Sequence, residues 1–364
     1  MTMHRALLTT AAAAAAVTIV PTSATAATCG VAQSRALFET PEVQVYASRG
    51  RAVACLRATG RSRVVGPRSS GRATTLVRGV AGGRWLSVVR AGAGGTNQAD
   101  LHQLIDLRTG RRAQVAERRT RVETVTLPGV LVHALGDGRG VVARFTSGRT
   151  VVLSRVKGAE GIAAAGNRVY WLEPNGSGDP KVRSARLSGV PAAASGPTAR
   201  PTQKIGSCPA DAEGRLVLHD RSRVVTQRPD GVRVCNRWTG KTWNVGDAQT
   251  TFEALTTEGL AYRSPTTAGL LRFATSAQVE LPVAADASSV ASATFLAGAT
   301  ADGLRSANAA KSTAPADLLD AGAVTDVAAA LVPASDRPED DTVIYWTDAE
   351  GDARTATLPV KTQE

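Results

Sequence analysis

Two segments of the chain, 180 residues apart, have nearly the same sequence. They are Cys55-Leu-Arg57-Ala-Thr59-Gly60-Arg61 and Cys235-Asn-Arg237-Trp-Thr239-Gly240-Lys241. Each has a second cysteine at almost the same distance upstream, Cys29 in the first case and Cys208 in the second. Self-similarity at a long period indicates a repeat architecture, which constrains the fold before any site is considered. It does not identify a substrate or a partner.

Strand patterns dominate the rest of the sequence, and long helical periodicity is scarce. Five segments are rich in β-branched, aromatic and other apolar residues and are bounded by turn-forming residues, which is typical of β-strands. These segments are Val43–Ala47, Arg84–Val89, Gly140–Phe145, Arg168–Leu172 and Thr342–Trp346.

A hairpin pattern recurs, in which an apolar strand is followed by a polar turn ending in glycine, then Arg or Lys, then another strand. The turn glycine or its equivalent falls at Gly60, Gly110, Gly148, Gly189, Gly240, near Ser276, and at Gly351. The four intervals from Gly60 to Gly240 average 45 residues, which is the length of a four-stranded propeller blade. We therefore predict an all-β fold, a single β-propeller of seven four-stranded blades over residues 28–364.

Eight blades with little loop between them are the alternative. Seven is preferred because residues 284–332 are rich in alanine and weakly patterned, and Pro315–Gly322 within them is a candidate short helix. A closed ring leaves no unpaired edge. We expect Val43–Ala47 to close it by pairing with the last blade, near Thr342–Trp346 and Arg354–Leu358.

The recurrent turn resembles that of the β-propeller class, such as TolB-like and PQQ-like repeats, whose blades carry an Asp-x-x-Thr-Gly-Lys/Arg-like turn between two strands. Leu104 to Arg111 matches it best, with Asp106 in the acidic position. The similarity covers most of residues 40–360. The tryptophan of PQQ-like repeats is not reproduced cleanly and the Trp-Asp dipeptide is absent, so the resemblance implies a fold and no particular function.

The N-terminus has the features of a secretory signal peptide over residues 1–27. Arg5 provides the positive charge, Ala6–Val20 the apolar stretch, and Ala24-Thr-Ala26 a small-x-small cleavage site. The apolar stretch is shorter than the ~20 residues that span a bilayer, and no later segment approaches that length. We expect a secreted, extracellular protein with no membrane span. The composition, rich in Ala, Arg and Gly, resembles that of secreted actinobacterial proteins.

Four cysteines in an exported chain favour disulfides over metal binding. Three connectivities are possible, and the matched spacings favour Cys29 with Cys55 and Cys208 with Cys235. A zinc site would need tighter clusters such as C-x-x-C, and the sequence contains none. Two acidic clusters could supply oxygen ligands to calcium, but solvated turns explain both, and we predict no metal and no cofactor. The clusters are Asp336, Glu339, Asp340 and Asp341, and then Asp348, Glu350 and Asp352.

The basic charge is concentrated in the first part of the chain. Residues 28–155 carry 21 basic and 7 acidic side chains, a net charge of +14, whereas residues 270–364 carry 6 and 14, a net charge of −8. Closing the ring as expected would bring these two arcs together. One interpretation is solvated strand faces in an arginine-rich protein. The other is a basic arc that binds an anionic polymer, which outside a cell would be teichoic acid or acidic polysaccharide rather than nucleic acid.

No local pattern indicates catalysis, and no catalytic residue can be named. The G-x-S-x-G elbow is absent, and the three histidines beyond the leader, His102, His133 and His219, are isolated in sequence. His102 and His133 fit ordinary strand or loop positions. Gly240-Lys241-Thr242 lacks the earlier glycine of a phosphate-binding loop, so a hairpin turn explains it better.

Aromatic residues number only 14, fewer than sugar-stacking platforms would suggest. Trp85, Trp171 and Trp346 lie in apolar strands and are predicted to be core residues, whereas Trp238 and Trp243 flank a turn and could be exposed.

We therefore expect a monomeric, disulfide-stabilised propeller that acts as a binding or scaffold module at the cell envelope. Its arginine-rich loops would contact an envelope protein or an anionic cell-wall polymer. The candidate contacts come from a run with six arginines and one acid, Glu117: they are Arg111, Arg112, Arg118, Arg119 and Arg121. The alternative is an exported hydrolase or lyase with its site in the central channel.

Overall fold

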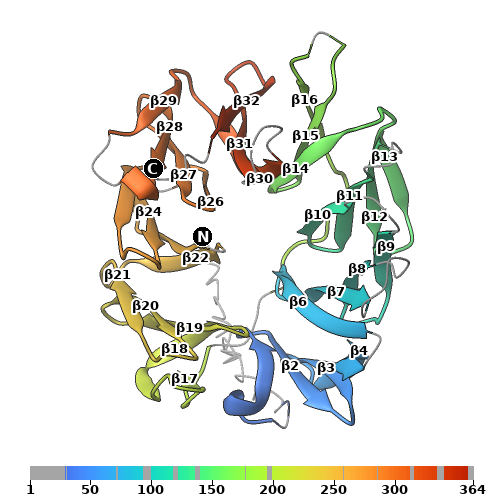
Figure 1. Ribbon diagram of the computed structural model, residues 1–364, viewed down its shortest axis with the longest axis vertical. Helices are drawn as coiled ribbons and strands as arrows, with labels where there is room; N and C mark the ends of the chain where they lie inside the picture. The colour runs from blue at the N-terminus through green and yellow to red at the C-terminus, as the bar shows by residue number, and fades with distance from the viewer. Residues whose placement is uncertain are drawn as a thin grey trace, which may run out of the picture.

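A computed structural model describes most of the chain beyond residue 28 and shows a ring of antiparallel β-sheets (Figure 1). The described residues are 29, 31–70, 73–92, 100–117, 122–135, 140–176, 178–194, 199–256, 258–284, 286–311, 315–333 and 340–359. Within them the only helices are two 3₁₀ turns, η1 (Gln33–Arg35) and η2 (Ala309–Lys311). The all-β propeller class is thereby confirmed. The proposed leader, residues 1–27, lies outside the described residues.

The strands form seven hydrogen-bonded sheets, the number predicted for the blades, and the largest has nine strands because two units join edge to edge. Counted by unit, eight groups of strands surround the centre.

The first half of the chain supplies units 1 to 4. Unit 1 is β1 (Ala36–Glu39), β2 (Val43–Ser48), β3 (Arg51–Leu56) and β4 (Arg61–Pro67). Unit 2 is β5 (Ser69–Ser70), β6 (Ala73–Ala81), β7 (Trp85–Gly92), β8 (Asp100–Asp106) and β9 (Arg112–Glu117). Unit 3 is β10 (Val122–Leu127), β11 (Val130–Leu135), β12 (Gly140–Phe145) and β13 (Thr150–Ser154). Unit 4 is β14 (Glu160–Ala165), β15 (Arg168–Glu173) and β16 (Lys181–Arg186).

The second half supplies units 5 to 8. Unit 5 is β17 (Pro201–Thr202), β18 (Asp211–His219), β19 (Arg223–Arg228), β20 (Gly231–Asn236) and β21 (Thr242–Val245). Unit 6 is β22 (Thr251–Leu255), β23 (Gly259–Arg263), β24 (Thr267–Arg272) and β25 (Gln278–Pro282). Unit 7 is β26 (Ser289–Ser292), β27 (Phe295–Thr300), β28 (Gly303–Asn308) and β29 (Asp317–Asp320). Unit 8 is β30 (Thr325–Pro333), β31 (Asp340–Thr347) and β32 (Ala353–Leu358).

The units do not follow the chain around the ring in one direction. Units 1 to 4 lie in sequence, but unit 4 then contacts unit 8, and the order returns through units 7, 6 and 5 to unit 1 (Figure 1). Separate clusters of buried apolar side chains fill the contacts between neighbouring units, for example Val65 with Leu86 and Trp85 with Val122. The two halves of the chain therefore run around the ring in opposite directions and meet at two seams.

The first seam is the antiparallel contact between β1 and β18, where Glu39 lies opposite His219. These positions are 180 residues apart, the same offset as Cys55 and Cys235, so each residue faces its own equivalent across an approximate two-fold axis.

The second seam, between units 4 and 8, also joins equivalent residues. The rings of Tyr170 and Tyr345 are stacked with their centroids 5.6 Å apart. The Tyr345 hydroxyl donates to the Gly161 carbonyl at 2.6 Å, and the Tyr170 hydroxyl lies 2.6 Å from the Thr347 hydroxyl.

The expected closure of the ring is therefore wrong. Val43–Ala47 lies within β2, which pairs with β1 and β3, and the last unit meets unit 4 instead of unit 1. The second half of the chain runs around the ring in the opposite direction to the first. The basic arc, residues 28–155, therefore lies between units 4 and 5 and does not close against the acidic arc, residues 270–364. The candidate helix Pro315–Gly322 is also wrong, since Asp317–Asp320 is strand β29, paired with β28.

Local predictions fare better. The five predicted strand segments lie in strands, except that Arg84 precedes β7, and all seven predicted turn positions have a positive φ, including Ser276 at 59°. Both disulfides form within their repeats, Cys29 with Cys55 and Cys208 with Cys235. Trp85, Trp171 and Trp346 are buried, and Trp238 is 69% exposed, whereas Trp243 is buried against Phe273 and not exposed. In the described part of the chain no helix is long and apolar enough to cross a membrane.

Candidate anion-binding site

Many arginines of the ring are paired with carboxylates. Arg84 pairs with Asp106, Arg183 with Glu173 at 3.0 Å, and Arg354 with Asp348 at 2.7 Å. Further ion pairs join Arg57 and Arg200 to Glu39, Arg168 and Arg186 to Asp326, Arg228 to Asp211, and Arg305 to Asp302. The positive charges of these arginines are largely balanced by the carboxylates. They therefore contribute little net charge that could attract a ligand.

In units 1 and 2, a group of seven arginines has no carboxylate partner among the described residues. We call this group the arginine face: Arg51, Arg61, Arg63, Arg90, Arg108, Arg111 and Arg112. Five of the seven are exposed, and Arg63 and Arg90 are half-buried. The concentration of basic residues seen in the sequence is therefore present here as uncompensated positive charge.

Several of these side chains bind backbone carbonyls of the neighbouring unit. Arg63 donates from Nε to the Leu107 carbonyl and from a terminal nitrogen to the Arg108 carbonyl, both at 2.9 Å. In the opposite direction, Arg112 of β9 donates to the Val64 carbonyl of β4 at 3.1 Å. These bonds fix the guanidinium groups in place without neutralising them, and each group keeps further N–H donors.

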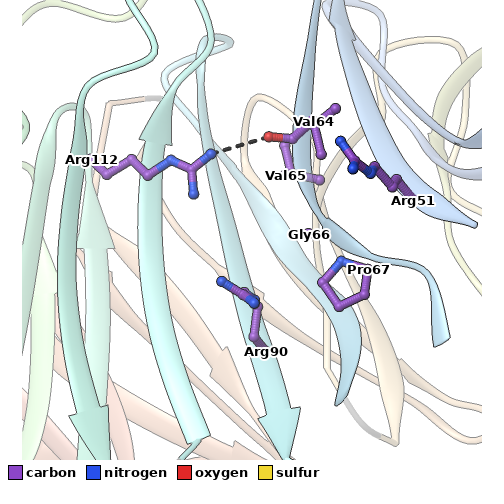
Figure 2. A pocket seen from close by; sticks show the side chains of 7 residues that line it. All are labelled: Arg51, Val64, Val65, Gly66, Pro67, Arg90 and Arg112. Carbon is purple, nitrogen blue, oxygen red and sulfur yellow. Dashed lines mark hydrogen bonds between the residues drawn. The ribbon is translucent and has the colours of Figure 1, made fainter. Parts of the chain in front are cut away.

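A cleft of about 370 Å³ opens within the arginine face, where β4 of unit 1 meets unit 2 (Figure 2). It is lined by Arg51, Val64, Val65, Gly66, Pro67, Arg90 and Arg112. Figure 2 shows Arg112 extending from β9 toward the Val64 carbonyl, with Arg90 below it. The three arginines come from three different strands, β3, β7 and β9, and no acidic residue lines the cleft.

A β-bulge shapes the wall of this cleft. Ala52 pairs with Gly66 and Val53 with Val64, so that Val65 is an extra residue on β4. Val65 is fully buried while Val64 is 43% exposed, and its carbonyl is directed to Arg112. Bulges redirect side chains and carbonyls in this way and are common beside functional sites.

Gly66 allows β4 to approach β6 closely. A Cβ at this position would collide with the Thr75 hydroxyl and would lie 3.4 Å from Cδ of Arg90. The Nε of Arg90 is buried and has no hydrogen-bond partner in the described residues, and the same holds for the Thr75 hydroxyl. A buried donor without an acceptor is unfavourable, so the packing of Arg90 at this position carries a cost.

The recurrent turn at Asp106 fixes the backbone at Arg108, a member of the arginine face. The Asp106 carboxylate accepts bonds from the Arg108 backbone N–H at 2.9 Å and the Thr109 hydroxyl at 2.8 Å. Burial raises the pKa of Asp106, but the hydrogen bonds from Arg84, from the Thr109 hydroxyl and from the Arg108 backbone together outweigh it. The pKa of Asp106 is therefore held below its usual value. The acidic position of the motif thus closes the turn, and its charge is used internally.

Of the sequence-predicted contacts, Arg112 lines the cleft and Arg111 is exposed beside it, whereas Arg118, Arg119 and Arg121 lie outside the described residues. That these arginines bind a ligand stays a prediction. Sequence reasoning missed Arg51 and Arg90. The sequence did contain a signal for Arg90, because this charged residue directly follows the apolar residues of the predicted strand Arg84–Val89.

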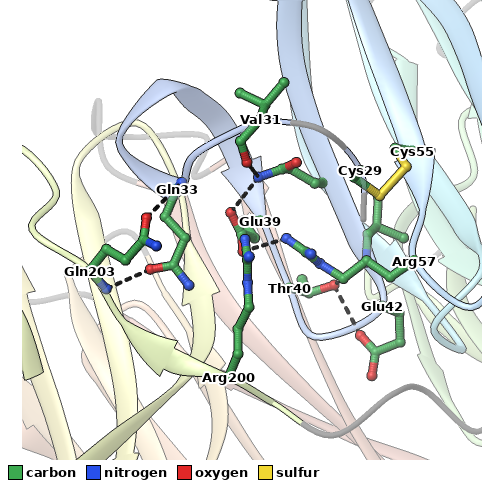
Figure 3. Close-up of polar contacts among 12 residues, drawn as sticks. Cys29, Val31, Gln33, Glu39, Thr40, Glu42, Cys55, Arg57, Arg200 and Gln203 are labelled. Atoms are coloured by element: carbon green, nitrogen blue, oxygen red, sulfur yellow. Dashed lines mark hydrogen bonds and ion pairs between the residues drawn. A yellow bond between two sulfur atoms is a disulfide. The ribbon is translucent and has the colours of Figure 1, made fainter. Parts of the chain in front are cut away.

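A second polar cluster, at the first seam, is structural in character (Figure 3). Glu39 is fully buried and accepts bonds from Arg57 at 2.6 Å, Arg200 at 2.8 Å and the Gln44 amide at 3.0 Å. Figure 3 shows the two guanidinium groups reaching Glu39 from different directions, close to the Cys29–Cys55 disulfide. The carboxylate is thereby saturated, so this cluster holds the two halves together.

His102 and His133 lie on strands β8 and β11, as predicted, and His219 lies on β18. His133 and His219 are fully buried. Burial, with Arg144 and His102 adding to it, lowers the pKa of His133 to about 4; burial and Arg237 lower the pKa of His219 to about 3. Both are therefore neutral at physiological pH.

Strands β10, β14, β22, β26 and β30 lie toward the centre of the ring (Figure 1). On β22, Glu253 contacts Arg263 at 3.7 Å and the Ser289 hydroxyl of unit 7, and its burial raises its pKa above the usual value. Of the residues that the structure describes, no three His, Cys, Asp or Glu side chains lie close enough together to hold a metal ion.

No protein-family model matches the chain, and no curated protein matches it. Similar solved structures include apo AztD from Citrobacter koseri, with 11% identity, coverage of 86% of this chain and 93% of that chain, and a TM-score of 0.25. An oligogalacturonate lyase in complex with manganese has 13% identity, coverage of 90% and 99%, and a TM-score of 0.25. The uncharacterised protein lmo1340 from Listeria monocytogenes has 9% identity, coverage of 90% and 96%, and a TM-score of 0.28. At such low values, nothing about the function of this protein follows from these likenesses.

Proposed function

We propose that the protein is a binding module of the cell envelope that contacts an anionic cell-wall polymer through the arginine face. The observation that carries the proposal is a group of unpaired arginines on two neighbouring units. Many arginines elsewhere in the ring pair with carboxylates, whereas all seven of the arginine face are without a carboxylate partner among the described residues. Uncompensated guanidinium groups grouped on one surface attract polyanions and raise their local concentration.

An extracellular location fits this role. The two disulfides are typical of proteins that mature in an oxidising compartment, and the N-terminal segment has the composition of a secretory leader. The anionic polymers available there are teichoic acids and acidic polysaccharides. An envelope protein with an acidic surface is the competing partner, but a face this rich in exposed arginine and poor in exposed apolar residues favours a repeating charge over a packed protein interface.

The test is binding of the purified chain to immobilised poly(glycerol phosphate), with uncharged dextran as the blank. We expect retention that weakens as salt rises, because exposed charges are screened over about 10 Å at moderate ionic strength. Replacing Arg61, Arg63, Arg108 and Arg111 with Ser should abolish most of it.

The matched control removes the same charge from exposed cations elsewhere: Arg155, Lys157, Lys204 and Arg221, each to Ser. Retention of this control should stay near that of the original chain. Equal losses in the two variants would show that total charge, and not the arginine face, governs binding. No retention of the unmodified chain would end the proposal.

A further inference from the structure

Resting on the proposed function, we infer that the cleft between β4 and unit 2 is a subsite for a single phosphate group of the polymer. The remaining arginines would then hold the rest of the polymer by charge alone. The inference adds two things to the arginine face: a defined place for one repeat unit and a preference for phosphate over carboxylate.

The placement of the donors favours phosphate. Arg51, Arg90 and Arg112 line the cleft from three separate strands, β3, β7 and β9. A tetrahedral phosphate presents oxygens in several directions and can accept from more than one guanidinium group. A planar carboxylate presents two oxygens in one plane, which suits one guanidinium fork better than three groups on separate strands.

The site is already prepared for such an acceptor. Arg112 is held by its bond to the Val64 carbonyl at 3.1 Å, which leaves its other donors for a ligand. Arg90 is packed so that its Nε is buried and without a partner in the described residues. Side chains fixed before binding lose little conformational freedom when the ligand arrives.

The dimensions match one repeat unit. About 370 Å³ is near the lower end of the range for small-molecule sites, enough for a phosphate with a glycerol or sugar attached. Val64 and Pro67 provide apolar contact beside the charged groups, suited to the carbon atoms of such a unit. Gly66 keeps this wall open, because a side chain there would press on Thr75 and on the stem of Arg90.

The first measurement is titration calorimetry of the full chain with glycerol 3-phosphate, with glycerophosphoglycerol, and with glucuronate. Glycerol 3-phosphate represents a chain end, glycerophosphoglycerol an internal diester, and glucuronate an acidic sugar. We expect both phosphate compounds to bind more tightly than glucuronate. Whichever phosphate compound binds more tightly shows whether the cleft binds the end of a polymer or an internal phosphodiester. Equal or tighter binding of glucuronate would overturn the inference.

Variants then locate the binding. Arg90→Gln removes one charged donor and should weaken phosphate-ester binding by about tenfold, while Arg112→Lys keeps the charge, loses the fork and should also weaken it. Arg221→Gln removes one exposed charge in unit 5 and should have no effect. Thermal unfolding of each variant checks that the fold is intact. Unchanged binding in both cleft variants would overturn the inference.

The outcome is separable from that of the proposed function. If the chain binds poly(glycerol phosphate), and Arg90→Gln and Arg112→Lys bind it as well as the original, the arginine face stands and the subsite falls. If the cleft binds phosphate esters but the polymer is not retained, the subsite stands and the polymer is the wrong ligand.

Discussion

Glu39 has no exposed surface, yet its carboxylate lies where the two halves of the chain meet. Arg57 of its own half and Arg200 of the linking segment both donate to it, so one buried anion joins two cations from either side of the seam. A buried ion pair is most costly when only one member is removed, because the remaining charge is left in the interior.

We expect Glu39→Gln to lower the free energy of unfolding by about 3–5 kcal/mol, because Arg57 would remain buried without a counter-charge. Urea unfolding at neutral pH measures this. Glu213→Gln is the matched control: its partner Arg228 has two other carboxylates and Glu213 is exposed, so the change should be within about 0.5 kcal/mol. A small effect at Glu39 would mean that water reaches the seam.

His133 and His219 make the fold sensitive to mild acid. Their pKa values in the folded chain are about 4 and about 3, whereas an unfolded histidine titrates near 6.5. As the pH falls below 6.5 the unfolded chain takes up protons that the folded chain does not, so stability falls with pH. Each histidine should remove about 2 kcal/mol between pH 7 and pH 5.

The measurement is urea unfolding at a series of pH values in that window, where most carboxylates do not yet titrate. His219→Leu eliminates one titrating group and should reduce the slope of stability against pH by about half. The same slope in the variant and the original chain would show that His219 is protonated without loss of the fold.

The recurrent turn is the element that the sequence predicted best, because its requirement is local. Gly148 has φ of 101° and open space around its Cα, so a side chain there would meet only backbone strain. We expect Gly148→Ala to destabilise by about 1 kcal/mol. Gly176 also has open space but no positive φ, and Gly176→Ala should be neutral or slightly stabilising. Thermal unfolding compares the two, and equal shifts would contradict the argument.

The strands show where local patterns suffice and where they fail. Thr342–Trp346 and Arg168–Leu172 were predicted as strands because their alternation and β-branched residues are local properties. Pro315–Gly322 suggested a helix, but pairing of Asp317–Asp320 with β28 decides its conformation. The cleft illustrates the same limit: Arg112 was found from a run of arginines, while Arg51 and Arg90 join it only through the packing of units 1 and 2.

Stacking of Tyr170 on Tyr345 holds the second seam, and it predicts that the two residues are energetically coupled. In a double-mutant cycle with Tyr170→Leu and Tyr345→Leu, we expect a coupling free energy of about 1 kcal/mol from urea unfolding. Trp243→Leu, at the distant contact of units 5 and 6, should be additive with Tyr170→Leu. Additive effects of the two tyrosine changes would show that the seam does not depend on their contact.

The order of the units is the feature that sequence reasoning did not anticipate. Equal spacing of turns predicts a repeat of about one unit in length, but not the direction in which the units are joined. A further repeat was available, since Val169-Tyr170-Trp171 and Ile344-Tyr345-Trp346 recur 175 residues apart, close to the offset of the cysteine segments. Two such offsets of similar length mark a duplicated half-chain of four units, but they do not reveal the direction in which the second half runs.

Equivalent strands that face each other across both seams are what a homodimer of one half-chain would show. In such a dimer every residue on the axis would meet its own copy, and Glu39 would confront a second buried glutamate. Joining the copies in one chain frees the two positions to differ, as Glu39 and His219 do. The same freedom lets one half become basic while the other becomes acidic. A symmetric ancestor would carry two arginine faces, whereas this protein has one, and it should bind one ligand per ring.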